Sequence, residues 1–312
     1  MNEVIDLAIV GGGTAGMAAA LVCGRASLDV VVFNTERARN RVVRSSHGFL
    51  TRDGAPPSLM LATAREQLAN YPTLRYRTDA VIGIERAAHG FDLPVAGGGL
   101  VRSRRVLIAT GMRDDLESLG LPGLGEVYGR SVFPCPFCDG FELRDKPLAV
   151  FALSVSDDVL QHYLAMVQQL SSADLRVFFN GAPPSGAVAQ ALADRGIAVV
   201  SEAVRRLHSN EGQLRSVELE DGRVVMCEAG FCVGDYAVMA TSFAEQLGAQ
   251  MSENPVGWTV VSAEDDGSTS IPGLFVAGDV RMGFSGLMVA AAQGSTCAAG
   301  IVRHNAMERW GA

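Results

Sequence analysis

Two cysteines separated by two residues are the strongest chemical feature of the sequence. Cys135 and Cys138 enclose Pro136 and Phe137, and Asp139 follows directly. Two intervening residues let the sulfurs reach disulfide distance across one turn, and a helix N-terminus lowers the pKa of nearby thiols. Asp139 is a candidate acid or base for moving thiol protons. The expected chemistry is thiol–disulfide exchange at a redox-active pair.

Two other uses of the cysteine pair fit the sequence less well. A structural zinc site needs two further ligands, usually from a second C-x-x-C or an H-x-x-x-H pattern, and the chain has neither. A buried apolar pair would suit a core helix, whereas Pro134 and Pro136 indicate an ordered turn. In a long chain without a secretory signal, C-x-x-C favours redox chemistry over a structural disulfide. We therefore expect no metal.

A glycine-rich turn near the N-terminus is typical of dinucleotide binding. Gly11, Gly13 and Gly16 form G-x-G-x-x-G between an apolar segment, residues 5–10, and a helical segment, residues 15–25. These glycines allow a tight turn, close approach of a pyrophosphate and close helix–strand packing, and the helix N-terminus offers free N–H groups to the phosphates. The sequence therefore predicts a phosphate-binding turn here.

The ribose partner of this turn is ambiguous. An acidic residue is expected about 20 residues after the glycines. Asn34 occupies the end of the second strand instead, and Glu36 lies nearby. An asparagine can still bond a ribose hydroxyl, so we assign Asn34 and leave Glu36 as the alternative.

Strand and helix patterns predict the scaffold around these motifs. Residues 5–10, 15–25 and 30–33 form one β-α-β unit, and residues 148–153, 157–170 and 175–179 form a second, which favours parallel sheets. A meander over 203–233, a strand at 274–277 and a helix over 286–304 follow. We expect an α/β fold with two Rossmann-like nucleotide-binding domains, the second inserted into the first. The expected domains are 1–114 with 245–312, which binds the dinucleotide, and 115–244, which carries the cysteine pair.

Two further motifs give the chain a family resemblance. Residues 107–111 contain A-T-G, and residues 271–279 read I-P-G-L-F-V-A-G-D. The order of these motifs around the cysteine pair resembles low-molecular-weight thioredoxin reductase over nearly the whole chain. The resemblance implies FAD as cofactor, a homodimer, and a bond from Asp279 to the ribityl chain. The expected cofactor-binding residues are Gly11, Gly13, Thr14, Ala15, Gly16, Asn34, Thr110, Gly111, Gly278 and Asp279.

A narrower resemblance concerns the substrate. Residues 39–41, 47–54, 135–138 and 141–145 are similar to the dithiol oxidases of the gliotoxin, holomycin and romidepsin pathways. These enzymes close a disulfide in a small molecule and pass the electrons through FAD to oxygen. Many of them carry histidine directly after the second cysteine, whereas this chain has Asp139, as thioredoxin reductase does. The resemblance also makes His47 a possible residue of the site.

The second β-α-β unit lacks the glycines of the first. When the two apolar strands are aligned, Ala152, Ser154 and Asp157 replace the three glycines. Side chains at 152 and 154 would crowd a pyrophosphate, and Asp157 would cap the helix and repel a phosphate. No arginine follows the next strand, in residues 180–184, to hold a 2′-phosphate. We expect nicotinamide binding to be lost, with residual NADPH binding as the alternative.

These features predict an oxidase mechanism with two rivals. A substrate dithiol attacks Cys135, expected to be the more exposed sulfur, while Cys138 lies nearer the isoalloxazine and passes electrons to it. The first rival is a thioredoxin reductase-like enzyme that draws electrons from NADPH or from a protein such as ferredoxin. The second is a non-catalytic redox sensor, which retention of both cysteines and Asp139 disfavours.

Composition excludes several partner classes. A net charge of −8 provides no basic stripe for nucleic acid, and no apolar run reaches about 18 residues, so we expect no membrane span. The start of the chain has no basic n-region, so we expect no secretory signal and a cytoplasmic location. The remaining cysteines, Cys23, Cys227, Cys232 and Cys297, have no ligand partners in the pattern and are expected to be structural.

Overall fold

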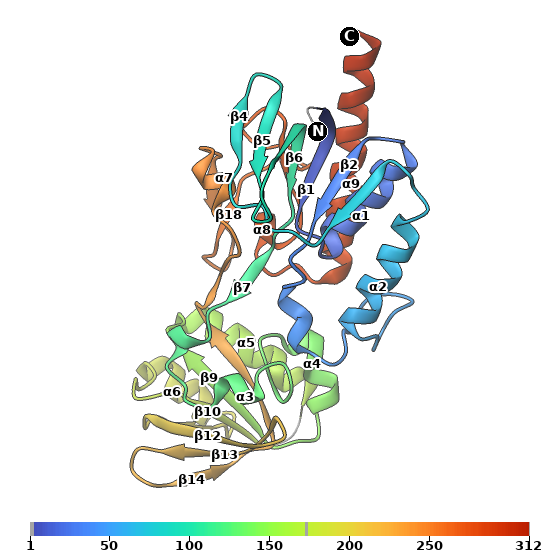
Figure 1. Ribbon diagram of the computed structural model, residues 1–312. Coiled ribbons are helices and arrows are strands. Elements are labelled where there is room, and N and C mark those ends of the chain that lie inside the picture. The colour runs from blue at the N-terminus through green and yellow to red at the C-terminus, as the bar shows by residue number, and fades with distance from the viewer. Residues whose placement is uncertain (1–2, 172–173, 312) are drawn as a thin grey trace. The chain divides into compact units, whose positions relative to one another are not determined.

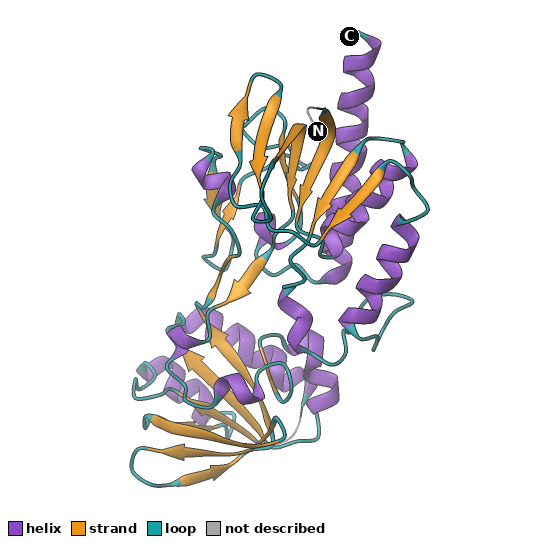
Figure 2. Ribbon diagram, in the orientation of Figure 1, coloured by secondary structure: helices purple, strands orange, loops and turns teal. Residues whose placement is uncertain are grey.

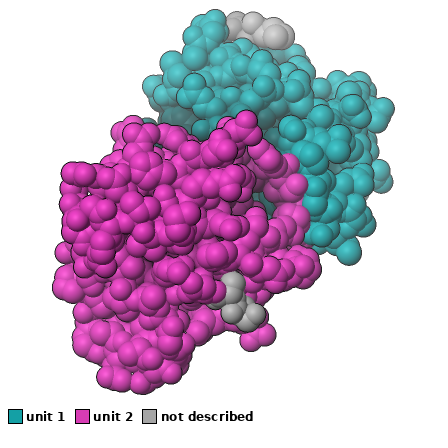
Figure 3. Space-filling view, turned by 90° about the horizontal axis from the view of Figure 1, so that it is seen from below, with its two compact units in different colours: residues 1–41, 49–113, 237–312 teal, residues 42–48, 114–236 magenta. Residues whose placement is uncertain are grey.

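The computed structural model describes residues 3–171 and 174–311, which form two compact units of mixed helices and strands (Figures 1 and 2). Unit 1 comprises the described residues of 1–41, 49–113 and 237–312, and unit 2 comprises 42–48 and 114–236 (Figure 3). Residues 237–244, expected in the inserted domain, belong to unit 1. The short segment 42–48 belongs to unit 2, which no sequence pattern indicated.

Unit 1 is built on one sheet. Its strands are β1 (Val4–Val10), β2 (Val30–Phe33), β3 (Leu74–Arg77), β4 (Glu85–Ala87), β5 (Gly90–Pro94), β6 (Leu100–Ile108) and β19 (Leu274–Val276). The order among the described residues is β3-β2-β1-β6-β5-β4, and β19 also pairs with β6. The strands β3, β2, β1, β6 and β19 run parallel, while β4 and β5 extend the sheet as an antiparallel hairpin.

Alternating side chains of β1 enter two cores on the two faces of this sheet. Leu7 and Ile9 pack with α1 (Thr14–Arg25) and α9 (Leu287–Trp310), whereas Ala8 and Val10 join the core of the opposite face. Each buried aliphatic side chain contributes about 1.5–3 kcal/mol of transfer free energy. The apolar run of β1 therefore predicts a strand covered on both sides. The helix α9 extends six residues beyond the expected His304.

The remaining elements of unit 1 are short, apart from one helix. They are η1 (Arg39–Val42), α2 (Pro57–Leu68), α7 (Phe243–Gln246), α8 (Asp279–Met282), and the strand pairs β7 (Met112–Asp114) with β16 (Ala237–Met239) and β17 (Met251–Glu253) with β18 (Thr259–Val261). The pair β7–β16 joins the two chain segments that lead into and out of unit 2.

Unit 2 repeats the β-α-β principle. Its strands are β8 (Val132–Phe133), β9 (Leu148–Leu153), β10 (Leu175–Phe178), β11 (Ala198–Val200), β12 (Val204–Asn210), β13 (Gln213–Leu219), β14 (Val224–Met226) and β15 (Ala229–Gly234), and its helices are η2 (Glu117–Leu119), α3 (Leu124–Val127), α4 (Pro136–Leu143), α5 (Asp157–Leu170) and α6 (Gly186–Ala193). A parallel sheet has the order β11-β10-β9-β15-β8, and β12, β13 and β14 form an antiparallel sheet. The expected meander is thus wrong for β15, which is buried on both faces and joins the parallel sheet.

Candidate active site

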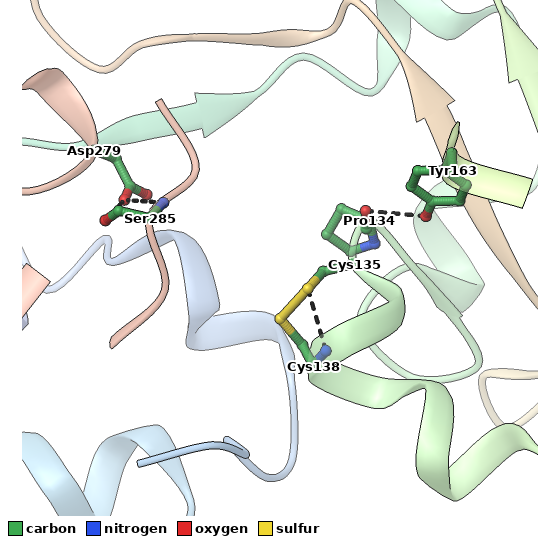
Figure 4. The surroundings of a disulfide bond; sticks show 6 residues. All are labelled: Pro134, Cys135, Cys138, Tyr163, Asp279 and Ser285. Carbon is green, nitrogen blue, oxygen red and sulfur yellow. Dashed lines mark hydrogen bonds between the residues drawn. A yellow bond between two sulfur atoms is a disulfide. The ribbon is translucent and has the colours of Figure 1, made fainter. Parts of the chain in front are cut away.

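The cysteine pair lies at the start of α4 (Figure 4). Cys135 and Cys138 form a disulfide, and Cys135 is the N-cap residue of the helix. Its Sγ atom accepts a hydrogen bond of 3.2 Å from the N–H group of Cys138. Pro136 occupies the first helical turn, where its missing N–H leaves no bond unmade. After reduction of the disulfide, the helix N-terminus would stabilise a thiolate on Cys135.

The exposure of the two cysteines is the reverse of the expected one. Cys135 is only 6% exposed, whereas Cys138 is intermediate between buried and exposed. The reason is local, because an N-cap side chain folds back over the first turn of its own helix. The expectation that Cys135 is the more exposed sulfur is therefore wrong for this structure.

Asp139 has the electrostatic setting of an acid–base group. It is partly buried on α4, and burial raises the pKa of its carboxyl group. The negative charge of Glu142 raises that pKa further, to about 7. A carboxyl group that titrates near neutrality can take and return protons at physiological pH. The predicted role of Asp139 therefore has a physical basis beside the cysteine pair.

Tyr163 of α5 is a residue of this site that sequence reasoning missed. Its hydroxyl donates a hydrogen bond of 3.1 Å to the carbonyl oxygen of Pro134 (Figure 4). Burial raises the pKa of Tyr163 well above its usual value, so the hydroxyl stays protonated as a donor. The bond fixes the backbone directly before Cys135. Its sequence signal, a place on the apolar face of α5, resembles that of any core tyrosine.

His47 reaches α4 from the segment 42–48 of unit 2. Its Nδ1 atom lies 3.6 Å from Oε1 of Glu142, one helical turn after Asp139. The sequence suggested His47 as a site residue only through its family resemblance, and it singled out no partner for it. The structure pairs it with a carboxylate on the helix that bears the cysteines.

The glycine-rich turn of unit 1 connects β1 to α1 through close backbone contacts. A Cβ atom on Gly11 would lie 2.3 Å from the carbonyl oxygen of Ala109, and one on Gly16 would lie 1.9 Å from that of Gly11. Neither position can hold a side chain without moving backbone. A Cβ atom on Gly13 would instead meet no protein atom within 4 Å. The space beside Gly13 is therefore open for a ligand.

The N-terminus of α1 suits a phosphate group. Its N-cap, Gly13, forms no side-chain cap, and its first turn contains no acidic residue. Thr14, Ala15 and Gly16 thus present N–H groups of the kind that bind phosphates at helix starts. A surface depression at this point is lined by Gly13 and Thr14 together with Asn40 and other residues of unit 1. These residues fit the pyrophosphate of FAD.

Asn34 lies beside this turn at the end of β2. A Cβ atom on Gly12 would lie 2.5 Å from the Cβ atom of Asn34. The Asn34 amide nitrogen donates to the Tyr76 hydroxyl at 2.6 Å, and its oxygen accepts the N–H of Glu36 at 3.1 Å. Glu36 itself pairs with Arg65 at 3.0 Å. Asn34 therefore supports the turn, and its contact with a ribose remains a prediction.

The other two cofactor motifs end at the same edge of the unit 1 sheet. Thr110 and Gly111 follow β6, while Gly278 and Asp279 follow β19, the parallel neighbour of β6. The glycine turn follows β1, which also pairs with β6 in parallel. Ligands of open α/β sheets bind at this carboxyl edge. The structure thus places the three motifs at one edge of the sheet.

Side chains at this edge are held by local bonds. Oγ1 of Thr110 lies 3.0 Å from Oγ1 of Thr241. Oδ1 of Asp279 accepts hydrogen bonds from the N–H of Ser285 at 3.1 Å and from its hydroxyl at 2.8 Å (Figure 4). Asp279 is therefore fixed in orientation at the start of α8. A fixed carboxylate at this place fits the expected bond to a ribityl hydroxyl.

The corresponding turn of unit 2 corrects the alignment of the two nucleotide folds. β1 ends at Val10 and α1 begins at Thr14, while β9 ends at Leu153 and α5 begins at Asp157, so three residues form each turn. The equivalent pairs are Gly11 with Ser154, Gly13 with Ser156, and Gly16 with Val159. The alignment of Gly11 with Ala152 is wrong by two residues. A strand that is apolar on both faces looks the same after such a shift.

The turn of unit 2 is closed by its own side chains. Ser156 is the N-cap of α5, and its hydroxyl accepts the N–H of Val159 at 3.4 Å. The Asp157 carboxylate accepts a 2.6 Å hydrogen bond from Ser185, the N-cap of α6, which in turn accepts the N–H of Val188 at 3.2 Å. Side chains therefore occupy the helix starts that a dinucleotide phosphate would use.

Other features of the described chain have no catalytic setting. No cluster of three or more His, Cys, Asp or Glu side chains among the described residues could hold a metal ion. No helix in the described ranges is long and apolar enough to cross a membrane. The other four cysteines are buried, and burial raises the pKa of Cys227 to about 11 and that of Cys23 to about 12.

Comparisons with known proteins agree with this architecture. The model of the pyridine nucleotide-disulphide oxidoreductase family matches residues 5–159. The structure of a Bacillus anthracis protein, provisionally assigned as thioredoxin reductase TrxB, is 34% identical, covers 98% of this chain and 99% of its own, and superposes with a TM-score of 0.90. The structure of HlmI is 29% identical with a TM-score of 0.87 and covers 100% of this chain and 99% of its own.

A curated relative extends the likeness to fungi. Thioredoxin reductase aclD of Aspergillus oryzae is 29% identical over 315 residues, which cover 98% of each chain. Proteins of this family typically bind FAD. Near-complete coverage at 34% identity, with a disulfide at the start of α4, shows more than a shared fold. The chain therefore belongs to the pyridine nucleotide-disulphide oxidoreductases, as a flavin-type thiol–disulfide oxidoreductase that resembles low-molecular-weight thioredoxin reductase.

Proposed function

We propose that the chain is an FAD-dependent dithiol oxidase that closes a disulfide in a small molecule and delivers the electrons to oxygen. One observation carries this proposal, namely the closed nucleotide turn of unit 2. A nicotinamide dinucleotide would compete with Ser156 for the first N–H groups of α5 and would bring phosphate charge beside Asp157. Residues 180–184 offer no arginine for a 2′-phosphate. Electrons are then supplied by thiols.

FAD fits the open turn of unit 1. The N–H groups of Thr14, Ala15 and Gly16 would hold its pyrophosphate, and Asp279 would bond its ribityl chain. When bound, FAD supplies the redox chemistry, because it can take two electrons from a dithiol and deliver them to oxygen. The contributions of the chain itself are to bind the cofactor, exchange disulfides and move thiol protons.

The cysteine pair performs the exchange in two steps. A substrate thiolate attacks Sγ of Cys135, which breaks the bond to Cys138 and releases a Cys138 thiolate. The second substrate thiolate then attacks the substrate sulfur of the mixed disulfide and expels Cys135. The substrate now holds a new disulfide, and the enzyme holds two thiols. Asp139 accepts thiol protons during these steps. With oxygen as the final acceptor, one dithiol and one O₂ give one disulfide and one H₂O₂.

The choice of Cys135 follows from the reverse reaction. Both directions pass through the same mixed disulfide, so the attacked sulfur is also the sulfur that would attack a disulfide product. The better nucleophile of the reduced pair near neutral pH is the thiol with the lowered pKa. Cys135 is the N-cap of α4 and accepts the N–H of Cys138, an arrangement that would stabilise its thiolate after reduction.

The relatives support a second candidate. Both aclD and the Bacillus anthracis protein carry the name thioredoxin reductase. In that function electrons would run from NADPH, or from a protein donor such as ferredoxin, toward a protein disulfide. The same cysteine pair would serve, with the direction of exchange reversed.

Anaerobic mixing separates the two candidates. The FAD-loaded protein is mixed first with NADPH and then with a small dithiol, while flavin absorbance is followed. We expect no rapid bleaching by NADPH, bleaching by the dithiol, and recovery in air with release of one peroxide per dithiol. A Cys135→Ser, Cys138→Ser double variant is the control and should not bleach with dithiol. Rapid bleaching by micromolar NADPH would favour the reductase instead.

A further inference from the structure

The contact between His47 and Glu142 joins two distant parts of the sequence at the cysteine helix. The segment 42–48 leaves unit 1 and packs in unit 2, where Nδ1 of His47 lies 3.6 Å from Oε1 of Glu142. Glu142 stands three residues after Asp139 on α4, and residues at this spacing are neighbours on a helix surface. Three ionisable side chains thus form a row that ends beside the cysteine pair.

We propose that Glu142 and His47 are positioning residues of the thiol–disulfide exchange: the Glu142 carboxylate makes Asp139 a base strong enough to take a thiol proton, and His47 holds that carboxylate in place. The inference rests on the proposed function only for the use of Asp139 as a base. A carboxylate beside a second carboxylate binds its proton more firmly, because two like charges at short distance repel. Burial of Asp139 also raises the pKa of its carboxyl group, so without Glu142 the pKa of Asp139 would be lower, though still raised, and Asp139 would be a weaker base.

Other groups around Asp139 do not supply this charge. Tyr163 of α5 interacts electrostatically with Asp139, and Cys232 of β15 interacts electrostatically with Tyr163. Burial raises the pKa of both groups well above neutrality, so both are uncharged. His47 approaches from the segment 42–48 and contacts Glu142. The anionic charge that acts on Asp139 is that of Glu142.

Exposure explains why Glu142 needs a partner. Its side chain is 43% exposed, so a free carboxylate could turn into water, where its charge would be screened. The contact with His47 holds the carboxylate in the arrangement in which its charge acts on Asp139. Arg144 does not take this role, because its guanidinium lies 4.1 Å from the centre of the Phe141 ring and pairs with Asp145 at 3.5 Å.

The direct test is the titration of Asp139 in the FAD-loaded protein. The infrared band of a protonated carboxyl group that disappears in Asp139→Asn is followed against pH. In the wild type its midpoint should lie at about 7. In Glu142→Gln the midpoint should fall by about one pH unit, a tenfold change in proton affinity. In His47→Gln it should fall less, because Glu142 is retained but no longer held.

Asp145→Asn is the matched control. It removes one carboxylate from the exposed end of the same helix region, where Asp145 is paired with Arg144. Its midpoint should equal that of the wild type. An unchanged midpoint in Glu142→Gln would overturn the proposal, and a rise in His47→Gln would overturn the holding role of His47. Near-ultraviolet circular dichroism checks that each variant is folded. Glu142→Asp keeps the negative charge, so its Asp139 midpoint should lie between those of Glu142→Gln and the wild type.

The readout does not depend on the oxidase reaction. If the wild type fails to oxidise dithiols, while the midpoint still falls in Glu142→Gln and not in Asp145→Asn, the proposed function fails and the positioning role stands. If dithiols are oxidised and the midpoint does not respond to Glu142, the reverse holds. In an active enzyme the pH profile of the exchange step should move with the infrared midpoint.

Discussion

Asp139 is the residue whose protonation should control the pH dependence of the enzyme. Burial and the Glu142 charge raise the pKa of its carboxyl group to about 7. As a base it must be ionised, so the rate of flavin reduction by a dithiol should rise with pH through about 7. In Asp139→Asn this rise should vanish and the rate should fall at least about tenfold, within the usual contribution of general base catalysis. Stopped-flow absorbance measures both effects.

Stability provides the control for this variant. Asp139 has a higher pKa in the folded protein than in the unfolded chain, so the folded state loses stability as pH rises from about 4 to about 7. Asp139→Asn removes this loss, and the variant should unfold at no lower urea concentration than the wild type at mildly alkaline pH. Unaltered FAD content with an unaltered rate profile would remove Asp139 from the mechanism.

The two cysteines should differ in the adducts that they form. Cys138→Ser leaves Cys135 free to hold a mixed disulfide, and we expect a stable adduct whose mass exceeds that of the protein by one bound substrate. Cys135→Ser should accumulate much less adduct. Intact-protein mass spectrometry after mixing with a small disulfide compares the variants directly. A stable adduct mainly on Cys138 would mean that exposure in the structure, rather than the helix N-cap, decides which sulfur reacts.

Residue-scale prediction succeeded where the backbone alone sets the chemistry. The spacing of Cys135 and Cys138 allows the disulfide that the structure contains. Glycine is required at Gly11 and Gly16, because a Cβ atom at either position would lie less than 2.5 Å from a backbone carbonyl oxygen. The exposure of Cys135 was not predictable, because it depends on the N-cap position of α4. Glu142 gave no signal either, since its partner lies nearly a hundred residues away.

At the scale of elements, the starts of α1 and α5 differ in what occupies them. Gly13 at the start of α1 has an ordinary negative φ and open space in place of a side chain, whereas Ser156 caps α5. Gly13→Ala should therefore leave the fold intact and weaken FAD binding, because the added methyl group enters the space assigned to the pyrophosphate. Fluorescence titration of the apoprotein with FAD would measure a Kd raised about tenfold or more.

Gly186→Ala is the matched control for that variant. Gly186 stands in the first turn of α6 in unit 2, and a Cβ atom there also meets no protein atom within 4 Å. Its substitution should change neither FAD affinity nor the far-ultraviolet spectrum. Equal effects of the two substitutions, or normal FAD affinity in Gly13→Ala, would contradict the assignment of the start of α1 as the pyrophosphate site.

Elements were predictable wherever one pattern sufficed. The β-α-β units emerged from apolar strands and a glycine turn, and their strand bounds agree with the structure to within one residue. The residue-by-residue alignment of the two β-α-β units was not predictable from their strands, since β1 and β9 are apolar on both faces. The helix caps Gly13 and Ser156 fix it in the structure. The sequence predicts a meander at β15, because its place in the parallel sheet depends on partners distant in the sequence.

At the scale of the whole molecule, each unit has its own cores and its own proposed task. The core clusters of unit 1 surround its sheet, and those of unit 2 surround β9, β10 and β15. The residues expected to bind the cofactor belong to unit 1, and the cysteine pair belongs to unit 2. The insertion of one unit into the other was predictable from the order of motifs. The homodimer remains a prediction from family resemblance, which sedimentation of the purified protein would test.

Hydrogen exchange should report this division of tasks. A ligand that binds only the folded state protects the amides it contacts and stabilises the folded unit that holds it. Removal of FAD should therefore speed exchange in α1 and at the carboxyl ends of β1, β6 and β19, all in unit 1, while β9 and β10 of unit 2 stay protected. NADPH should not slow exchange at the start of α5, where Ser156 and Asp157 already fill the turn.

Mass spectrometry compares the peptides of three samples: the apoprotein, the FAD-loaded protein, and the FAD-loaded protein with NADPH. NADP⁺ is the control for a redox effect. Slower exchange at α5 with both nucleotides would show that unit 2 has kept a nicotinamide site and would move the function toward the reductase.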